Sequence, residues 1–315
     1  MKKKVIMVLG ATGFLGSHVC ELLKGQKYKI VKASISAGQD FLNFENTYKF
    51  FKRIKPDVVL NCASFGGSVH HVMKNPALVI KNNMLILINL YECASKMKKK
   101  PFIVNAMANC SYPHKLDVQK EKRWLDGPVH NSVYSFGNIT RMKYFVSKGY
   151  FDQYKVKSIN LIFGGIYGPG DHLVDNRLHA FDGIILRMVK AKLENLKYFS
   201  IWGSGKPIRE WIYVKDAAKA MVKALKIKKT ILEPINVSQK LVLSINKIAQ
   251  ITKKALSFNG VIKHDRSFQD GAFKKVLARE KSFLKNFPKF TFTKFDVAVK
   301  DTVKYYLNEL IKLKK

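Results

Sequence analysis

The chain has 315 residues and a formal net charge of +35, and this length is enough to bury a substantial core in one or two domains. The lysines are scattered from Lys2 to Lys315 without a groove-reading motif, so the charge indicates a solvated surface that attracts anionic substrates and argues against nucleic-acid binding. No apolar run approaches the ~18 residues of a membrane span, and the four cysteines fit no zinc or disulfide spacing, so we expect a cytoplasmic protein without metal or membrane contact.

The first predicted elements are a strand, a glycine-rich turn and a helix. The apolar run over 5–9 is followed by Gly10-Ala-Thr-Gly13-Phe-Leu-Gly16, which opens an amphipathic stretch to Leu23. The first glycine permits a tight turn, the second lets the backbone approach a pyrophosphate, and the third allows close packing of helix on strand. The helix start also offers free N–H groups to phosphates. We therefore expect a dinucleotide to contact Gly10, Thr12, Gly13, Phe14, Leu15, Gly16 and, after the third strand, Ala63.

The next segments continue an alternation of strands and helices. Such an alternation predicts an α/β fold with a parallel, doubly wound sheet of the Rossmann type. The predicted strands cover 29–34, 57–63, 101–106 and 157–163, and the predicted helices cover 44–54, 72–97 and 132–154.

The end of the second predicted strand bears on the choice of cofactor. NAD-dependent Rossmann sites usually carry an acidic residue there, which binds the ribose hydroxyls. Here the strand ends in Lys32-Ala-Ser34 and has no acid. This favours NADP, with NAD as the alternative.

Past Gly168-Pro169-Gly170 the alternation changes. Residues 178–193, 216–225 and 295–313 have helical patterns, and 198–202 and 210–214 are short extended segments around Gly203-Ser-Gly205. We expect residues 1–165 to form an NAD(P)-binding domain with a return segment near 210–236. Residues 166–315 are expected to form mainly a smaller α/β substrate-binding lobe.

Five motifs, taken in order, carry a resemblance to a known family. They are Gly10–Gly16, Phe65-Gly-Gly67, Asn109-Cys-Ser-Tyr-Pro113, Tyr167-Gly-Pro-Gly-Asp171 and Trp202-Gly-Ser-Gly-Lys-Pro-Ile-Arg-Glu210. The order resembles the extended short-chain dehydrogenase/reductases, and within them the nucleotide-sugar branch that contains GDP-L-fucose synthase. The resemblance implies NADP(H), a GDP-linked 4-keto sugar, a role in surface polysaccharide biosynthesis, and a homodimer formed through two long helices.

The same family implies two sets of catalytic residues. A Ser and a Tyr-x-x-x-Lys reduce the C4 ketone, and a Cys and a His exchange protons at C3 and C5. The reductase set is broken here, because the Tyr and Lys positions fall on Phe136 and Thr140 and the Ser position falls on Ala108. Moving the register to Tyr134 places a neutral Asn138 one turn on, and Lys143 lies one turn beyond Thr140.

The proton-exchange set is intact. Cys110 and His179 occupy the positions of the family's cysteine and histidine. Hydrogens next to a ketone are acidic enough for a histidine and a thiol to exchange them, one on each face of the ring. A buried hydrophobic cysteine and a surface histidine are the structural alternatives for these two residues. For the substrate we expect Arg187 and Arg209 at the diphosphate, Trp202 against the base or sugar, and Asn109 near the reacting ketone.

Three functions remain open from the sequence. The first is a C3/C5 epimerase that no longer reduces C4. The second is an NADP(H)-dependent C4 reductase or epimerase/reductase with a substitute acid such as Tyr134 or Lys143. The third is a catalytically silent cofactor-binding protein that regulates or scaffolds a partner, since fold alone does not fix function.

Overall fold

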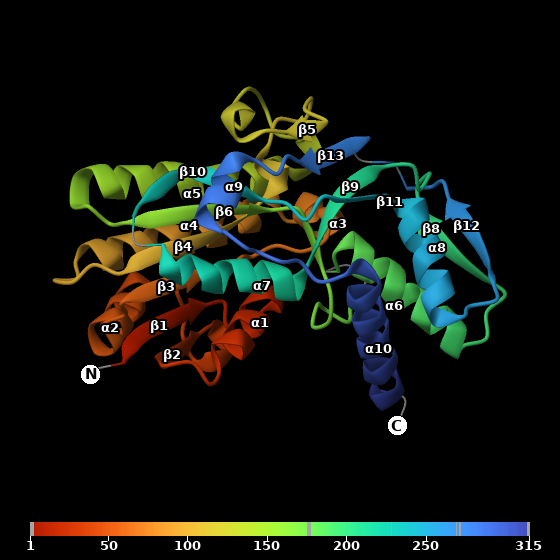
Figure 1. The fold of residues 1–315 in the computed structure, drawn as a ribbon, viewed down its shortest axis with the longest axis horizontal. Coiled ribbons are helices and arrows are strands. Elements are labelled where there is room, and N and C mark those ends of the chain that lie inside the picture. Colours follow the sequence, from red (N-terminus) through yellow and green to blue (C-terminus); the bar gives the residue numbers. More distant parts are fainter. Residues whose placement is uncertain (1–2, 175–177, 228, 269, 271, 314–315) are drawn as a thin grey trace.

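The computed structural model describes residues 3–174, 178–227, 229–268, 270 and 272–313. Its centre is a six-stranded parallel sheet with the order β10-β6-β4-β3-β1-β2 (Figure 1). This confirms the expected α/β class. The strands are β1 (Lys4–Leu9), β2 (Tyr28–Ala33), β3 (Val58–Asn61), β4 (Phe102–Ala108), β6 (Ser158–Phe163) and β10 (Ile231–Val237).

Helices cover both faces of this sheet, so its strands are buried on both sides. Alternate side chains of β1 divide between two cores: Ile6 and Val8 pack with α1 (Phe14–Leu23) and α7 (Val214–Lys223). Met7 and Leu9 belong to the second core, whose helices are α2 (Phe44–Ile54), α4 (Pro76–Ser95) and α5 (Tyr134–Tyr154).

The predicted helix over 72–97 is wrong in its continuity. The chain forms α3 (Val69–Lys74) and then α4, with Asn75 between them and Pro76 as the first residue of α4. Proline lacks an N–H and clashes with the preceding turn, so it begins helices and does not continue them. Among the described residues, α4 is the one helix long and apolar enough to cross a membrane. It packs against α2 and α5 in the fold.

A ladder of buried amides crosses the central sheet. Asn61, Asn105 and Asn160 are register partners on β3, β4 and β6. Asn61 Nδ2 donates to Asn105 Oδ1 at 2.9 Å, and Asn105 Nδ2 donates to Asn160 Oδ1 at 3.0 Å. Tyr91 and Ser147 join the ladder from the helices above it. The ladder pairs most of these polar groups in an interior where an unpaired one is costly, and the Oδ1 of Asn61 is the atom at its end without a partner among the described residues.

The second half of the chain adds a lobe at one end of the sheet (Figure 1). A five-stranded sheet has the order β11-β9-β13-β5 with β7 beside β9, and β8 pairs with β12. Helix α6 packs against α8 and α10. The elements are β5 (Val118–Gln119), β7 (Gly165–Tyr167), β8 (Tyr198–Trp202), β9 (Ile208–Tyr213), β11 (Leu241–Ser244), β12 (Val261–Asp265), β13 (Lys274–Leu277), α6 (Ala180–Leu193), α8 (Ile245–Leu256), α9 (Lys281–Asn286) and α10 (Phe295–Leu313).

Candidate functional site

The glycine-rich turn lies where the strand order reverses, between β1 and β3. Ligands of open α/β sheets bind at this switch point. Gly10 has a φ of +79°, and a Cβ there would lie 2.8 Å from the backbone N and Cα of Ala63. A Cβ on Gly16 would lie 2.0 Å from the carbonyl oxygen of Gly10. Both glycines are therefore required by the packing of the turn.

The N-terminus of α1 is suited to a phosphate. Gly13 precedes the helix without a side-chain cap, and the first turn contains no acidic residue. The first backbone N–H groups of a helix need partners, and an anionic ligand can supply them. Ser36 lies just after β2, and its Oγ is 2.7 Å from Oγ1 of Thr12. Residues 34–38 include no carboxylate. This donor-rich cradle fits a dinucleotide.

Cys110 lies in the short 3₁₀ turn η2 (Asn109–Ser111), directly after β4. Helix α5 packs on this turn through Gly137, where a Cβ would lie 2.8 Å from the carbonyl oxygen of Cys110. Burial raises the pKa of the Cys110 thiol to about 12, and the nearby charge of Lys143 opposes this shift. The thiol is therefore protonated at neutral pH. The amide of the neighbouring Asn109 is engaged with Gln119 at 3.3 Å.

The three residues expected from the sequence at the reductase positions lie as follows. A Cβ on Gly66 would be 3.1 Å from Cε2 of Phe136, so the phenyl ring faces the segment after β3. Thr140 is buried and its hydroxyl donates to the carbonyl oxygen of Phe136 at 3.0 Å. Ala108 ends β4 with a methyl group. None of these three side chains can donate a proton to a substrate.

Lys143 is buried below this region. Its Nζ donates to the carbonyl oxygen of Ala106 at 2.8 Å. Burial lowers the pKa of Lys143 to about 8, while the thiols of Cys62 and Cys110 favour its charged form. The amine is therefore hydrogen-bonded to β4, and its pKa of about 8 lies close to neutral pH.

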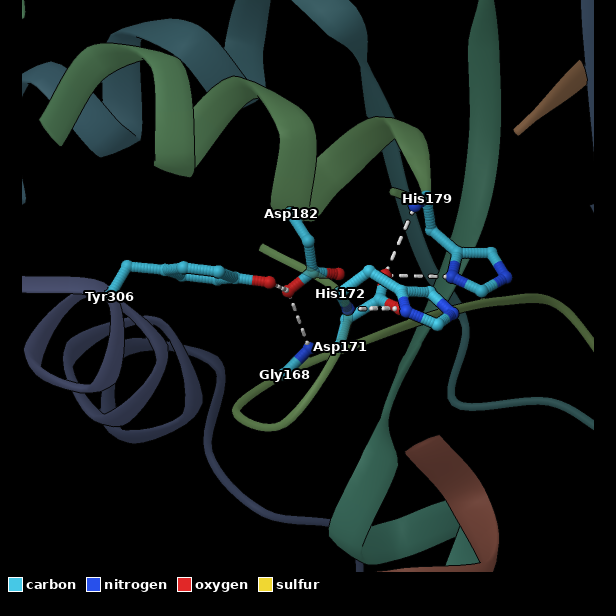
Figure 2. Close-up of polar contacts among 6 residues, drawn as sticks. All are labelled: Gly168, Asp171, His172, His179, Asp182 and Tyr306. Carbon is cyan, nitrogen blue, oxygen red and sulfur yellow. Dashed lines mark hydrogen bonds and ion pairs between the residues drawn. The ribbon is translucent and has the colours of Figure 1, made fainter. Parts of the chain in front are cut away.

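His179 precedes the first residue of α6 and makes two bonds to one carboxylate oxygen (Figure 2). Its Nδ1 lies 2.8 Å from Oδ2 of Asp171, and its backbone N–H donates to the same oxygen at 3.0 Å. Burial lowers the pKa of His179. The hydrogen bond to Asp171 and the charge of Asp171 together raise this pKa by more than burial lowers it, so the net shift is upward. The ring centroids of His179 and Phe14 are 5.7 Å apart, which brings the histidine to the cofactor turn.

Asp182 lies behind this pair and has no exposed surface (Figure 2). Its Oδ1 accepts from the N–H of Gly168 at 3.1 Å and from the Tyr306 hydroxyl at 3.2 Å. Burial and the negative charge of Asp171 raise the pKa of Asp182 well above its usual range. A charge on Asp171 therefore favours the protonated form of Asp182. Asp171 was not among the site residues predicted from the sequence, although it ends the Tyr167-Gly-Pro-Gly-Asp171 motif.

The arginines expected at the diphosphate lie in two places. Arg209 on β9 is the register partner of Lys275 on β13, so two cations are neighbours there. The Lys275 Nζ donates to the carbonyl oxygen of His114 at 2.6 Å. Nothing local in the sequence distinguishes Lys275 from other lysines. Arg187 lies instead over the Trp202 ring, 4.2 Å from its centroid.

Trp202 is covered more than the sequence analysis expected. The ring of Phe268 stacks on the indole, with centroids 4.6 Å apart and an interplanar angle of 11°. His70 of α3 touches both rings edge-on. With Arg187 also against the indole, a base or sugar that stacks on Trp202 must displace one of these groups.

A pocket of about 470 Å³ opens beside the Cys110 segment. Its lining includes His114, Val129, His130, Tyr134 and Asn138. Val129 connects it to the site, because Val129 packs against Gly137 next to the carbonyl of Cys110. The sequence analysis missed both histidines of this pocket.

A dinucleotide cradle at the switch point, with an Asp–His pair beside it, defines a Rossmann-type protein of the nucleotide-sugar short-chain dehydrogenase/reductase class. Residues 6–238 match the NAD dependent epimerase/dehydratase family, and the chain belongs to that family. It is 30% identical over 317 residues to a Drosophila melanogaster protein named "Probable GDP-L-fucose synthase", covering 96% of this chain and 97% of that protein.

Solved structures agree with this assignment. The fold is similar to a GDP-L-fucose synthetase from Naegleria fowleri bound to NADP, with a TM-score of 0.87, 26% identity, and coverage of 100% of this chain and 96% of that chain. A GDP-6-OMe-4-keto-L-xylo-heptose reductase from C. jejuni shares the fold at a TM-score of 0.85 and 20% identity, covering 100% of this chain and 99% of that chain. The resemblance to the nucleotide-sugar branch is confirmed, and these relatives carry the names of enzymes that act on GDP-sugars.

Proposed function

We propose that the protein is a C3/C5 epimerase of a GDP-linked 4-keto sugar in surface polysaccharide biosynthesis, and that it does not reduce C4. One observation carries this proposal. The Asp171–His179 pair is fully formed beside the cofactor turn, at 2.8 Å, whereas Phe136, Thr140 and Ala108 occupy the reductase positions.

In this reaction His179 and Cys110 exchange protons with the sugar. Because Nδ1 of His179 bonds to Asp171, its Nε2 serves as the base that removes a proton next to the C4 ketone. The protonated thiol of Cys110 returns a proton to the opposite face, and the roles reverse for the reverse reaction. The two groups lie on separate elements, η2 and the start of α6, and inversion requires that they reach opposite faces of the sugar ring.

The cofactor in this proposal is NADP(H), as in the Naegleria fowleri relative. The turn from Gly10 to Gly16 and Ala63 would hold it, and the lack of a carboxylate after β2 supports NADP over NAD. A nicotinamide supplies hydride transfer when a suitable acid is present. For the substrate, Arg209 with Lys275 would bind the diphosphate, with Arg187, Trp202 and Asn109 as further contacts.

Proton NMR in heavy water tests the proposal. A GDP-4-keto-6-deoxy sugar is incubated with the protein and NADP without added reductant. We expect the C3 or C5 proton signal to disappear while NADPH, added in a parallel sample, is not consumed. Cys110→Ala and His179→Asn each abolish exchange, and His172→Asn is the matched control because His172 is exposed and contacts Asp171 only through its backbone. Unchanged exchange in both variants contradicts the proposal.

One observation favours a second candidate, a C4 reductase with a substitute acid. Tyr134 is 46% exposed and lines the 470 Å³ pocket, so a phenol is present at the proposed site. This candidate predicts oxidation of NADPH by the keto sugar and its loss in Tyr134→Phe. If neither proton exchange nor NADPH oxidation is observed, the result favours a catalytically silent regulatory protein.

We also propose a homodimer formed through α4 and α5. These helices pack together and expose Leu78, Leu85 and Phe145. Burial of such side chains against a second copy removes apolar surface from water. Light scattering of the wild type and of Phe145→Glu tests this, because the charged variant would be monomeric.

A further inference from the structure

The proposed epimerisation leaves one chemical need unmet. Removal of a proton beside the C4 ketone places negative charge on the C4 oxygen, and a preorganised hydrogen-bond donor stabilises such charge. The inert side chains of Ala108, Phe136 and Thr140 supply none. The donor must therefore come from another part of the site.

The pocket beside the Cys110 segment contains a histidine whose tautomer is fixed. His130 precedes the 3₁₀ turn η4 (Asn131–Val133), and its Nδ1 accepts from the backbone N–H of Ser132 at 3.2 Å. Because a backbone N–H only donates, this contact assigns Nδ1 as the unprotonated nitrogen, and the Ser132 hydroxyl, whose Oγ lies 2.8 Å from Nδ1, can donate to the same atom. The neutral ring then carries its proton on Nε2, and this N–H has no hydrogen-bond partner among the described residues.

The charges around His130 keep the ring neutral. Partial burial lowers its pKa, and Lys275 of β13, His114 and Arg209 of β9 lower it further. Tyr134 and Asn138 of α5 face the same pocket. His130 is thus the reverse of His179, whose Nδ1 is bonded to a carboxylate and whose Nε2 is an acceptor.

We propose that this pocket receives the keto-sugar ring and that His130 Nε2–H donates a hydrogen bond to the C4 oxygen, replacing the absent Ser and Tyr donors. The assignment rests on the proposed epimerase function. His179 or Cys110 takes the C–H proton, the electron pair of that bond moves to the C4 oxygen as an enolate, and a proton returns to carbon from the opposite face. His130 keeps its own proton, and nothing is oxidised or reduced.

The proposed position of the diphosphate is consistent with this placement. Arg209 and Lys275 are near enough to His130 to lower its pKa, and they are the cations proposed to bind the diphosphate. The ring of a sugar attached to that diphosphate lies one glycosidic bond away from it. The pocket of about 470 Å³ is large enough for a hexose ring.

Three variants test the role of His130 by the heavy-water exchange experiment. Loss of one oxyanion donor slows a reaction by about 100-fold or more, so we expect a drop of this size in the exchange rate of His130→Ala with little change in KM. His130→Gln keeps an N–H at the Nε2 position and should recover at least about tenfold over the alanine variant. His264→Gln is the control, because His264 is exposed on β12 and does not line the pocket, so this variant should remain near the wild type.

Wild-type exchange in His130→Ala, or an equal loss in His264→Gln, overturns the inference while leaving the epimerase function intact. If the wild type shows no exchange, the proposed function fails, and ¹⁵N NMR of histidine decides the pocket separately. A shift of the His130 Nε2 signal on addition of the GDP-keto sugar, but not of GDP, supports the placement of the ring. The same shift with GDP alone, or no shift with either, refutes it.

Discussion

Asp171 binds His179 twice through a single oxygen, accepting from its backbone N–H at 3.0 Å and lying 2.8 Å from its Nδ1. The first bond fixes the start of α6, and the second fixes the ring. Because the same atom does both, the histidine cannot turn without disturbing the first turn of the helix. This geometry holds the imidazole with Nε2 available as a base.

Replacement of Asp171 by Asn tests that geometry. The neutral amide removes the charge that raises the pKa of His179, so this pKa should fall to the ordinary histidine value or below it. The amide can also select the wrong tautomer, and we expect proton exchange to decrease by about 100-fold. Histidine NMR titration measures the pKa, and the exchange assay measures the rate. An unchanged His179 pKa in this variant contradicts the orienting role of Asp171.

Asp182→Asn should behave differently, because burial and the charge of Asp171 raise the pKa of Asp182 and favour its neutral form. We expect near-normal exchange at neutral pH. The pKa of Asp182 is raised on folding, so the wild-type free energy of unfolding decreases as pH rises from the unfolded pKa, about 3.9, toward the folded pKa. The slope approaches about 1.4 kcal/mol per pH unit within that window. The variant lacks this loss, so its stability relative to the wild type should increase with pH.

Urea denaturation of both proteins between about pH 5 and pH 8 measures this difference. Tyr306→Phe is a useful companion, because it removes one donor to Asp182 without changing the carboxyl group. A constant stability difference across the pH range would show that Asp182 is ionised.

Restoration of the reductase set is a gain-of-function test. The triple variant Ala108→Ser, Phe136→Tyr, Thr140→Lys recreates a Ser and a Tyr-x-x-x-Lys at the positions where the family has them. We expect it to oxidise NADPH with the keto sugar at a rate at least about tenfold above the wild type. Thr140 is buried, so thermal unfolding must confirm that the lysine is tolerated. A wild type that already oxidises NADPH at a comparable rate would favour the reductase candidate.

The amide ladder should contribute strongly to stability. Asn105→Leu removes the partner of Asn61 and of Asn160 and one donor to Tyr91. Each buried polar group left unpaired costs about 1–3 kcal/mol, so we expect a total loss of roughly 3 kcal/mol or more. Chemical denaturation measures it, with the exposed Asn308→Leu as control. A loss similar to that of the control would mean that the ladder relaxes at little cost.

Gly10 and Gly25 form a matched pair for the cofactor turn. Both have positive φ, +79° and +74°, but only Gly10 lacks room for a Cβ, whereas Gly25 has nothing within 4 Å. Gly25→Ala should cost about 1–2 kcal/mol from backbone strain alone. Gly10→Ala must also move Ala63, so we expect a larger loss of stability and loss of NADP binding. Calorimetric titration with NADP and thermal unfolding separate the two effects.

The parts of the fold that the sequence predicted well are those with local signals. The helix bounds 44–54 and 295–313 agree with α2 and α10, because an apolar stripe repeats along each helix. The strands of the central sheet are apolar on both faces and stand out between helices. The strands β5 and β13 have two and four residues, and they form only because distant chain segments pair with them.

The site divides in the same way. The glycine turn is contiguous, so its place at the switch point follows from the pattern alone. The contact of Asp171 with His179 depends on a loop folding back, and that of Lys275 with Arg209 depends on sheet register. His130 was missed because its tautomer is set by a backbone N–H, which no residue type reveals.

The position of β10 has a consequence for how the chain acquires its structure. β10 pairs with β6, yet β7, α6, β8, β9 and α7 lie between these two strands in the chain. During synthesis, the edge of β6 therefore emerges from the ribosome long before its neighbour does. An unpaired apolar edge such as Ser158–Phe163 invites aggregation until it is covered. The central sheet is therefore completed only after residues 231–237 have been synthesised, so the first half of the chain depends on the second for its last strand.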